Sequence, residues 1–156
     1  MRIKAAPVSH LAYLIEWVEK SYGEIVELGI GIGSTPLLHE LCRVRRLTSY
    51  ENNNAIYSKF HEFDSEWHQL WLIDSWPSAN LERPWGLAFV DHDPPIERRD
   101  TIRRLKGHAD YILVHDTEPR HDRRFRIREL FKDFKYCREY TDYEPHTTIL
   151  SDKYAL

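Results

Sequence analysis

The sequence has no long hydrophobic run and few cysteines. None of its 156 residues lies in an apolar stretch that approaches the ~20 residues of a membrane-spanning helix. The first ten residues, MRIKAAPVSH, lack the apolar region of a signal peptide. The two cysteines, Cys42 and Cys137, are too few for the disulfide framework of a small secreted domain and do not have the spacing of a zinc site. We therefore expect a cytoplasmic protein that does not enter a membrane.

The sequence also has little excess charge of either sign. The formal net charge of −3 gives no general reason to expect nucleic acid or an anionic membrane as a partner. Apolar residues, by contrast, are plentiful: 42% of the chain is hydrophobic and five residues are tryptophan. That is enough apolar surface to offset the conformational entropy lost on folding. A chain of this length most simply forms one domain, residues 1–156, around a single core.

Short apolar runs alternate with amphipathic stretches along the chain. The pattern predicts strands at 24–29, 46–51, 67–74, 85–91 and 110–115, and helices at 9–20, 36–44, 56–63, 95–107 and 121–132. Thr35 and Pro36 are typical of an N-cap and the first helical residue, and Asp93 is typical of a cap before the helix at 95–107. Two further β-like runs, 135–141 and 146–151, predict an antiparallel hairpin. The expected fold class is α/β: a doubly wound, mostly parallel, Rossmann-like sheet of seven strands with a C-terminal antiparallel hairpin.

Acidic side chains lie where five of the predicted strands end. The segments are Glu27 to Gly29, Glu51-Asn52, Asp74-Ser75, Asp91-His92-Asp93 and His115-Asp116. Core packing does not require an acid at these positions. In a parallel sheet, ligands bind beyond the carboxyl ends of the strands. We therefore expect the functional site at this edge.

Three glycines, Gly29, Gly31 and Gly33, lie between the first predicted strand and the next helix. Glycine lets the backbone turn sharply and approach a ligand, and the amide groups at a helix start can donate to a carboxylate or phosphate. A dinucleotide-binding loop would have its third glycine at position 34, where this chain has Ser34. Glu27 instead suits S-adenosylmethionine, because a carboxylate can offset the positive sulfonium or accept from the amino group. The spacing favours S-adenosylmethionine.

The chain resembles the class I S-adenosylmethionine-dependent methyltransferases over nearly its whole length. The segment ELGIGIG, residues 27–33, is similar to the first motif of that family, and the predicted hairpin is similar to its antiparallel seventh strand. Within the class, FVDHDPPIERRDTIRRL and ADYILVHDTE resemble small O-methyltransferases, although His92 replaces a glycine and Pro94-Pro95 replace Ser-Tyr. The resemblance implies methyl transfer from S-adenosylmethionine to an oxygen of a small-molecule acceptor.

The same resemblance implies a cofactor role for the ends of the second and third predicted strands. Glu51 would bind both ribose hydroxyls, with Asn52 beside the sugar or the adenine. Asp74, with Ser75 and Trp76, would meet the adenine, the carboxylate accepting from the exocyclic amine and the indole covering the base. From the residues alone, Asn52 fits a turn equally well, and Trp76 fits ordinary packing.

The ends of the fourth and fifth predicted strands carry candidates for the chemistry. Methyl transfer to oxygen requires removal of a proton from a hydroxyl. Asp91, which would also face the methyl group of the cofactor, or His92 could act as the base, with His115 or Asp116 assisting. Alternatively, Asp91 and Asp116 could hold a divalent cation such as Mg²⁺, which would bind an acceptor diol and lower its pKa. We favour the alternative without a metal.

A basic segment follows the fifth predicted strand. Arg120, Arg124 and Arg128 would share one face of a helix, but Asp122 and Glu129 dilute their charge. A solvated helix face is therefore favoured over a nucleic-acid site.

Two other functions stay open at this point. The chain has few residues beyond the predicted fold that could form a substrate lid. This favours a noncatalytic cofactor-binding module, a module that a partner completes (for example in a homodimer), or a large acceptor. An NAD(P)-binding oxidoreductase is disfavoured by Ser34 and by the terminal hairpin.

Overall fold

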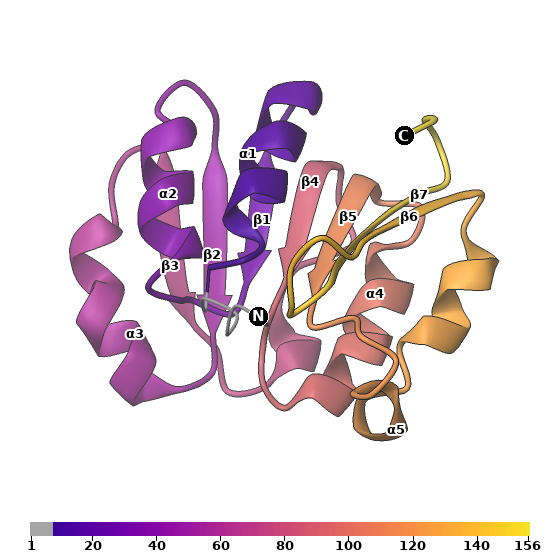
Figure 1. Ribbon diagram of the computed structural model, residues 1–156. Coiled ribbons are helices and arrows are strands. Elements are labelled where there is room, and N and C mark those ends of the chain that lie inside the picture. Colours follow the sequence, from indigo (N-terminus) through magenta and orange to yellow (C-terminus); the bar gives the residue numbers. More distant parts are fainter. Residues whose placement is uncertain (1–7) are drawn as a thin grey trace.

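The computed structural model describes residues 8–156, so the expectation that the first ten residues lack a signal peptide falls largely outside the described residues. A seven-stranded sheet crosses the molecule in the order β3-β2-β1-β4-β5-β7-β6 (Figure 1). Its strands are β1 (Ile25–Leu28), β2 (Leu47–Glu51), β3 (His68–Leu72), β4 (Trp85–Val90), β5 (Ala109–His115), β6 (Tyr136–Tyr140) and β7 (Thr147–Ser151). The first five are parallel to one another, and β7 is antiparallel to both β5 and β6. This confirms the predicted fold class, including the C-terminal hairpin.

Helices cover both faces of the sheet. They are α1 (Leu11–Lys20), α2 (Ser34–Leu41), α3 (Asn54–Phe60), α4 (Arg98–Leu105) and α5 (Asp122–Phe125), with 3-10 segments η1 (His61–Phe63), η2 (Trp76–Ser78), η3 (Pro95–Glu97) and η4 (Arg128–Asp133). On one face, Trp17 of α1 and Leu38 of α2 pack with Phe89 of β4. On the other, Ile102 of α4 packs with Val90 of β4. All six residues of β4 are buried, as expected of a central strand covered on both faces.

One part of the sheet is left open. The connection between β3 and β4 contains only the short segment η2. A groove of about 570 Å³ therefore runs along β2 and β3, where Tyr50, Trp71 and Arg83 are among its lining residues. Neither Glu51 nor Asp74, the acids at the ends of β2 and β3, lines this groove, so the groove is separate from the edge where the acids gather.

Several predicted helix details are wrong. The second helix begins at Ser34 with Gly33 at its N-cap, so Thr35 is not the cap. Asp93 makes no capping hydrogen bond to the segments that follow it. The predicted helix over 121–132 is broken into α5 and η4, because Arg126 has a φ of 51°, outside the helical region.

The break also separates the arginines of the basic segment. Arg120 lies before α5 and Arg128 after it, so the predicted shared helical face does not form. Both side chains are instead ion-paired: Arg120 with Glu118 and Glu144, and Arg128 with Glu139.

The longest helix among residues 8–156, α1, has ten residues. No described helix is long and apolar enough to cross a bilayer. Both cysteines are free thiols, Cys42 in the core and Cys137 exposed.

Candidate active site at the carboxyl ends of the strands

The glycine loop joins β1 to α2. Gly29 has a φ of 100°, and a Cβ there would lie 2.8 Å from the backbone of Asp91, so the fold itself requires glycine at this position. Gly31 differs, since a Cβ at that residue would meet only the Ser34 hydroxyl, at an ordinary 3.7 Å. A Cβ at Gly33 would approach Val8 to 3.3 Å, where α1 begins. The chain therefore leaves room beside Gly31 that none of its described residues fills.

Glu27 lies beneath this loop and is completely buried. Its carboxylate accepts hydrogen bonds from Ser34 at 2.6 Å, from Ser49 at 2.6 Å and from Thr35 at 3.0 Å. Burial raises the pKa of Glu27 to about 7, and the three hydroxyl donors partly oppose that rise. The carboxylate is thus held by the protein, and its expected contact with a cofactor stays a prediction.

Glu51 ends β2 and ties that strand to the glycine loop. Its Oε2 accepts from the backbone N–H of Ile30 at 3.0 Å, and its Oε1 accepts from the N–H groups of Asn52 and Asn53 at 3.0 and 2.9 Å. Only 5% of Glu51 is exposed. The amide bonds fix the orientation of the carboxylate at the edge of the sheet, beside the loop.

The segment after β3 is divided between surface and core. Asp74 and Ser75 are exposed. Trp76 is buried: its ring stacks on His92 at a centroid distance of 3.9 Å, and its indole N–H donates to the carbonyl of Asp93 at 2.7 Å. The Trp76 ring therefore packs in the protein interior. The adenine role of Asp74 stays a prediction.

A buried arginine, Arg98, organises the ends of β4 and β5. Its guanidinium donates to the carbonyls of His92 at 2.7 Å and His115 at 3.0 Å. It also lies 3.2 Å from the carboxylate of Asp91 and 3.5 Å from that of Asp116. Arg98 thus bridges Asp91 and Asp116, the two acids of the less favoured Mg²⁺ alternative, and its positive charge already offsets them.

Sequence reasoning missed Arg98, although a signal was present. Arg98 lies on the same helical face as Ile102 and Leu105, which are both buried. An arginine on the apolar face of a helix is a candidate for a buried ion pair.

Asp91 and His92 point in different directions. Asp91 follows β4 with a quarter of its side chain exposed. Burial raises the pKa of Asp91 to about 7, against the opposing charge of Arg98. His92 is buried, and its Nε2 lies 2.8 Å from the Thr101 hydroxyl. The structure places Asp91 at the edge and His92 against α4 and Trp76, so the two are not brought together.

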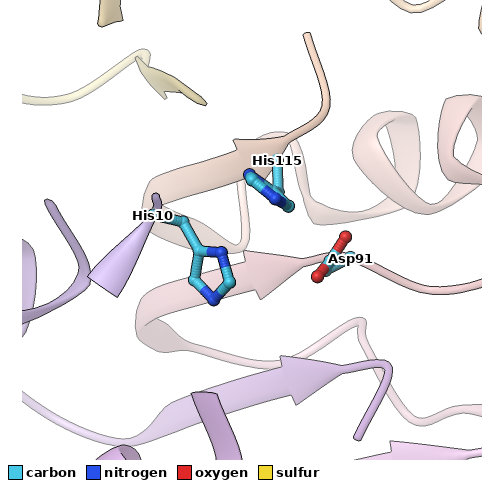
Figure 2. A group of neighbouring side chains, drawn as sticks. All are labelled: His10, Asp91 and His115. Atoms are coloured by element: carbon cyan, nitrogen blue, oxygen red, sulfur yellow. The ribbon is translucent and has the colours of Figure 1, made fainter. Parts of the chain in front are cut away.

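Two histidines and Asp91 meet at the same edge. His10 immediately precedes α1, and His115 is the last residue of β5. Figure 2 shows both imidazole rings and the Asp91 carboxylate around a common point. One ligand atom from each side chain lies within 4.8 Å of the others. Burial lowers the pKa of His10 and of His115 to about 3, so both rings are neutral at pH 7.

His10 was not expected from the sequence. It lies far along the chain from β4 and β5, and no spacing pattern links it to them. Asp116, beside His115, has a φ of 58°, a left-handed conformation that aspartate tolerates better than most residues. Such conformations are often found at functional sites.

Neither a protein-family model nor a curated protein sequence matches the chain. Solved structures do match its fold. The O-methyltransferase TomG from Streptomyces achromogenes, solved with S-adenosylmethionine, is 16% identical with a TM-score of 0.65, over 96% of this chain and 81% of TomG. An O-methyltransferase from Bacillus cereus, solved with S-adenosylhomocysteine, is 13% identical with a TM-score of 0.67, over 95% of this chain and 82% of that one.

A third similar structure carries a different activity in its name. The tRNA (m1A58) methyltransferase TrmI from Aquifex aeolicus is 13% identical with a TM-score of 0.63, over 97% of this chain and 71% of TrmI. At these identities the similarity establishes the fold alone. This chain has the Rossmann-like fold that the class I S-adenosylmethionine-dependent methyltransferases share.

Proposed function

We propose that this chain is an S-adenosylmethionine-dependent methyltransferase that methylates an oxygen of a small-molecule acceptor. The observation that carries the proposal is that the glycine loop and Glu51 lie side by side at the carboxyl ends of the strands. The hydrogen bond from Ile30 to Glu51 holds loop and acid side by side. Gly31, next to that bond, has space that the described chain does not use. An acid beside an open glycine loop suits a ribose and a methionine moiety lying across the strand ends.

Methyl transfer is a displacement at carbon. The acceptor oxygen forms a bond to the methyl carbon, the carbon–sulfur bond breaks with its electron pair staying on sulfur, and the acceptor proton must leave. With no metal ion bound to it, Asp91 at the end of β4 would receive that proton, since a carboxylate with a pKa near 7 is a suitable base at neutral pH. The rest of the task is alignment of the two reactants.

A small molecule is favoured over nucleic acid as the acceptor. Arg120 and Arg128, two of the three arginines expected to share a helical face, are ion-paired with acids of this chain. A nucleic-acid site needs cations available to phosphates. The similarity to O-methyltransferases supports oxygen as the acceptor atom, while the TrmI structure carries the same fold with tRNA in its name.

Calorimetry with S-adenosylhomocysteine and with NAD tests the proposal. The wild-type chain is expected to bind S-adenosylhomocysteine and not NAD. Glu51→Gln is expected to weaken that binding by about 1.5–3 kcal/mol, because a hydrogen bond to a charged group is lost. Binding of NAD alone would contradict the proposal.

Glu62→Gln serves as the matched control, since Glu62 is an exposed acid in η1. Its affinity for S-adenosylhomocysteine should equal that of wild type. An equal loss in both variants, or no loss in Glu51→Gln, would remove Glu51 from the cofactor site.

A further inference from the structure

We propose that His10, Asp91 and His115 form a binding site for a divalent transition-metal ion, with zinc as the best fit. The three side chains come from separate parts of the chain: the residue before α1, the end of β4 and the end of β5. They converge at one point, with a ligand atom from each within 4.8 Å of the others (Figure 2). Ligand atoms around a tetrahedral zinc ion are about 3.3 Å apart. The side chains therefore need to close in by at most about 1.5 Å.

The unmet hydrogen-bonding capacity of His10 is independent evidence for a ligand. His10 is 3% exposed, and neither ring nitrogen has a hydrogen-bond partner among residues 8–156. Its ring stacks on Phe89 at a centroid distance of 5.1 Å and meets the edge of His115 at 4.3 Å. A buried polar group without a partner costs about 1–3 kcal/mol, so an isolated imidazole is an expensive core residue. A metal ion would supply the missing partner to one nitrogen.

His115 is oriented for the same role. Its Nδ1 lies 3.3 Å from the Thr147 hydroxyl, which leaves Nε2 as the ligand atom. Metal-binding histidines commonly use the second ring nitrogen in this way to fix the ring. The nearest charged group to Nε2 is the carboxylate of Asp116, at 3.6 Å, and its negative charge favours a cation nearby.

Arg98 is a nearby positive charge that opposes a cation. It lies 3.2 Å from Oδ1 of Asp91. Asp116 supplies a second carboxylate, 3.5 Å from the same guanidinium. The single guanidinium of Arg98 is therefore shared between two acids.

The donor set indicates the kind of ion. Two imidazole nitrogens and one carboxylate oxygen suit zinc and similar transition metals, whereas Mg²⁺ prefers oxygen ligands alone. Three protein ligands also leave at least one coordination position open, as in catalytic zinc sites. The proposal does not rest on the methyltransferase function, because metal binding is measured without any cofactor.

A second group of potential ligands lies close by and provides the control. Asp116, Glu118 and His121 also bring ligand atoms within 4.8 Å of one another. Two of these carboxylates are already near arginines, Asp116 near Arg98 and Glu118 near Arg120. His121→Ala therefore removes a histidine from the neighbouring group while leaving the proposed site intact.

The test is titration of chelator-treated full-length protein with Co²⁺, followed by visible absorbance, and with Zn²⁺, followed by calorimetry. Wild type should bind one ion per chain, with Co²⁺ bands of a site that contains nitrogen ligands. His10→Ala should weaken Zn²⁺ binding at least about 100-fold, since even the loss of an outer partner of a ligand costs 10–100-fold. His121→Ala should bind like wild type.

A thermal-shift measurement keeps the proposal falsifiable if His10→Ala does not fold. Zn²⁺ should raise the midpoint of wild type by mass action and leave that of His10→Gln unchanged. The proposal is overturned if wild type binds neither ion, or if His121→Ala abolishes binding and the His10 variants do not. S-Adenosylhomocysteine binding, measured separately on the same samples, shows whether the proposed function stands or fails independently.

Discussion

The two halves of the strand-end edge treat their polar groups in opposite ways. At the β1–β2 end, both acids are satisfied by the protein: Glu27 by three hydroxyls and Glu51 by three backbone amides. At the β4–β5 end, Asp91 and Asp116 share the buried Arg98, and within the described part of the chain His10 has no hydrogen-bond partner for either nitrogen.

This is the difference expected between a preformed ligand-binding site and a reactive centre. Satisfied acids are rigid, so the β1–β2 end can position a ligand without reorganising. Buried polar groups that the protein leaves partly unsatisfied are typical of sites where protons or metal ions are handled. We therefore propose binding at one end of the edge and chemistry at the other.

The largest expected effect comes from removing the charge at the centre of the β4–β5 end. Arg98→Met should lower the free energy of unfolding by about 3–5 kcal/mol, because it leaves two largely buried carboxylates without their counter-ion. Urea denaturation at pH 7.5 measures the change.

Arg103 provides the control on the same helix. It is half exposed and paired with the exposed Asp100. Arg103→Met should therefore change stability by no more than about 0.5 kcal/mol. If both variants lose less than about 1 kcal/mol, Arg98 is not the organising charge of this end.

A smaller effect is expected at the β1–β2 end, and it depends on pH. Burial raises the pKa of Glu27 to about 7 from an ordinary 4.5, so the folded state holds the proton more tightly than the unfolded state. The stability from this group is fully present below about pH 4.5 and is lost as the pH rises to about 7. Glu27→Gln should become more stable than wild type across that window, by about 1–3 kcal/mol.

Unfolding free energies of the two proteins from pH 4 to 8 measure this effect. Their difference cancels the contributions of the buried histidines, which both proteins share. A difference that stays constant with pH would show that Glu27 ionises normally in the folded protein.

The smallest effect on stability is expected at His92. A variant at this position tests whether His92 serves packing or chemistry at the end of β4. His92→Phe keeps an aromatic ring on Trp76 and loses only the contact with Thr101. Stability should fall by about 1 kcal/mol, the typical worth of one hydrogen bond. Affinity for S-adenosylhomocysteine should stay within about twofold of wild type; a tenfold loss, about 1.4 kcal/mol, would place His92 in the cofactor site after all.

Much of the fold could be predicted because its signals are local. Central parallel strands such as WGLAFV are buried on both faces, so they read as continuous apolar runs. The prediction of one helix over 121–132 is wrong because that pattern reports burial alone. Ile127, Leu130 and Phe131 have helical spacing, but the backbone turn at Arg126 leaves no mark in that pattern. Hydrophobic periodicity reports which residues are buried, and a single backbone dihedral can still end the helix.

The candidate site was predicted in part. The strand-end acids and the glycine loop were expected because the topology of a parallel sheet brings its carboxyl ends to one edge. The partners of each group were not expected, since Arg98, Ser49 and Thr101 reach the site from other elements.

By itself, the sequence determined the order of strands and helices along the chain, the C-terminal hairpin, and the edge of the sheet at which polar residues gather. These follow from short-range patterns of apolar and polar residues along the chain. Only the tertiary structure decided which acids are satisfied, where the buried Arg98 lies and that His10 meets Asp91 and His115. Such contacts join residues far apart in the sequence, and burial and hydrogen bonding at each group depend on all of its neighbours in space.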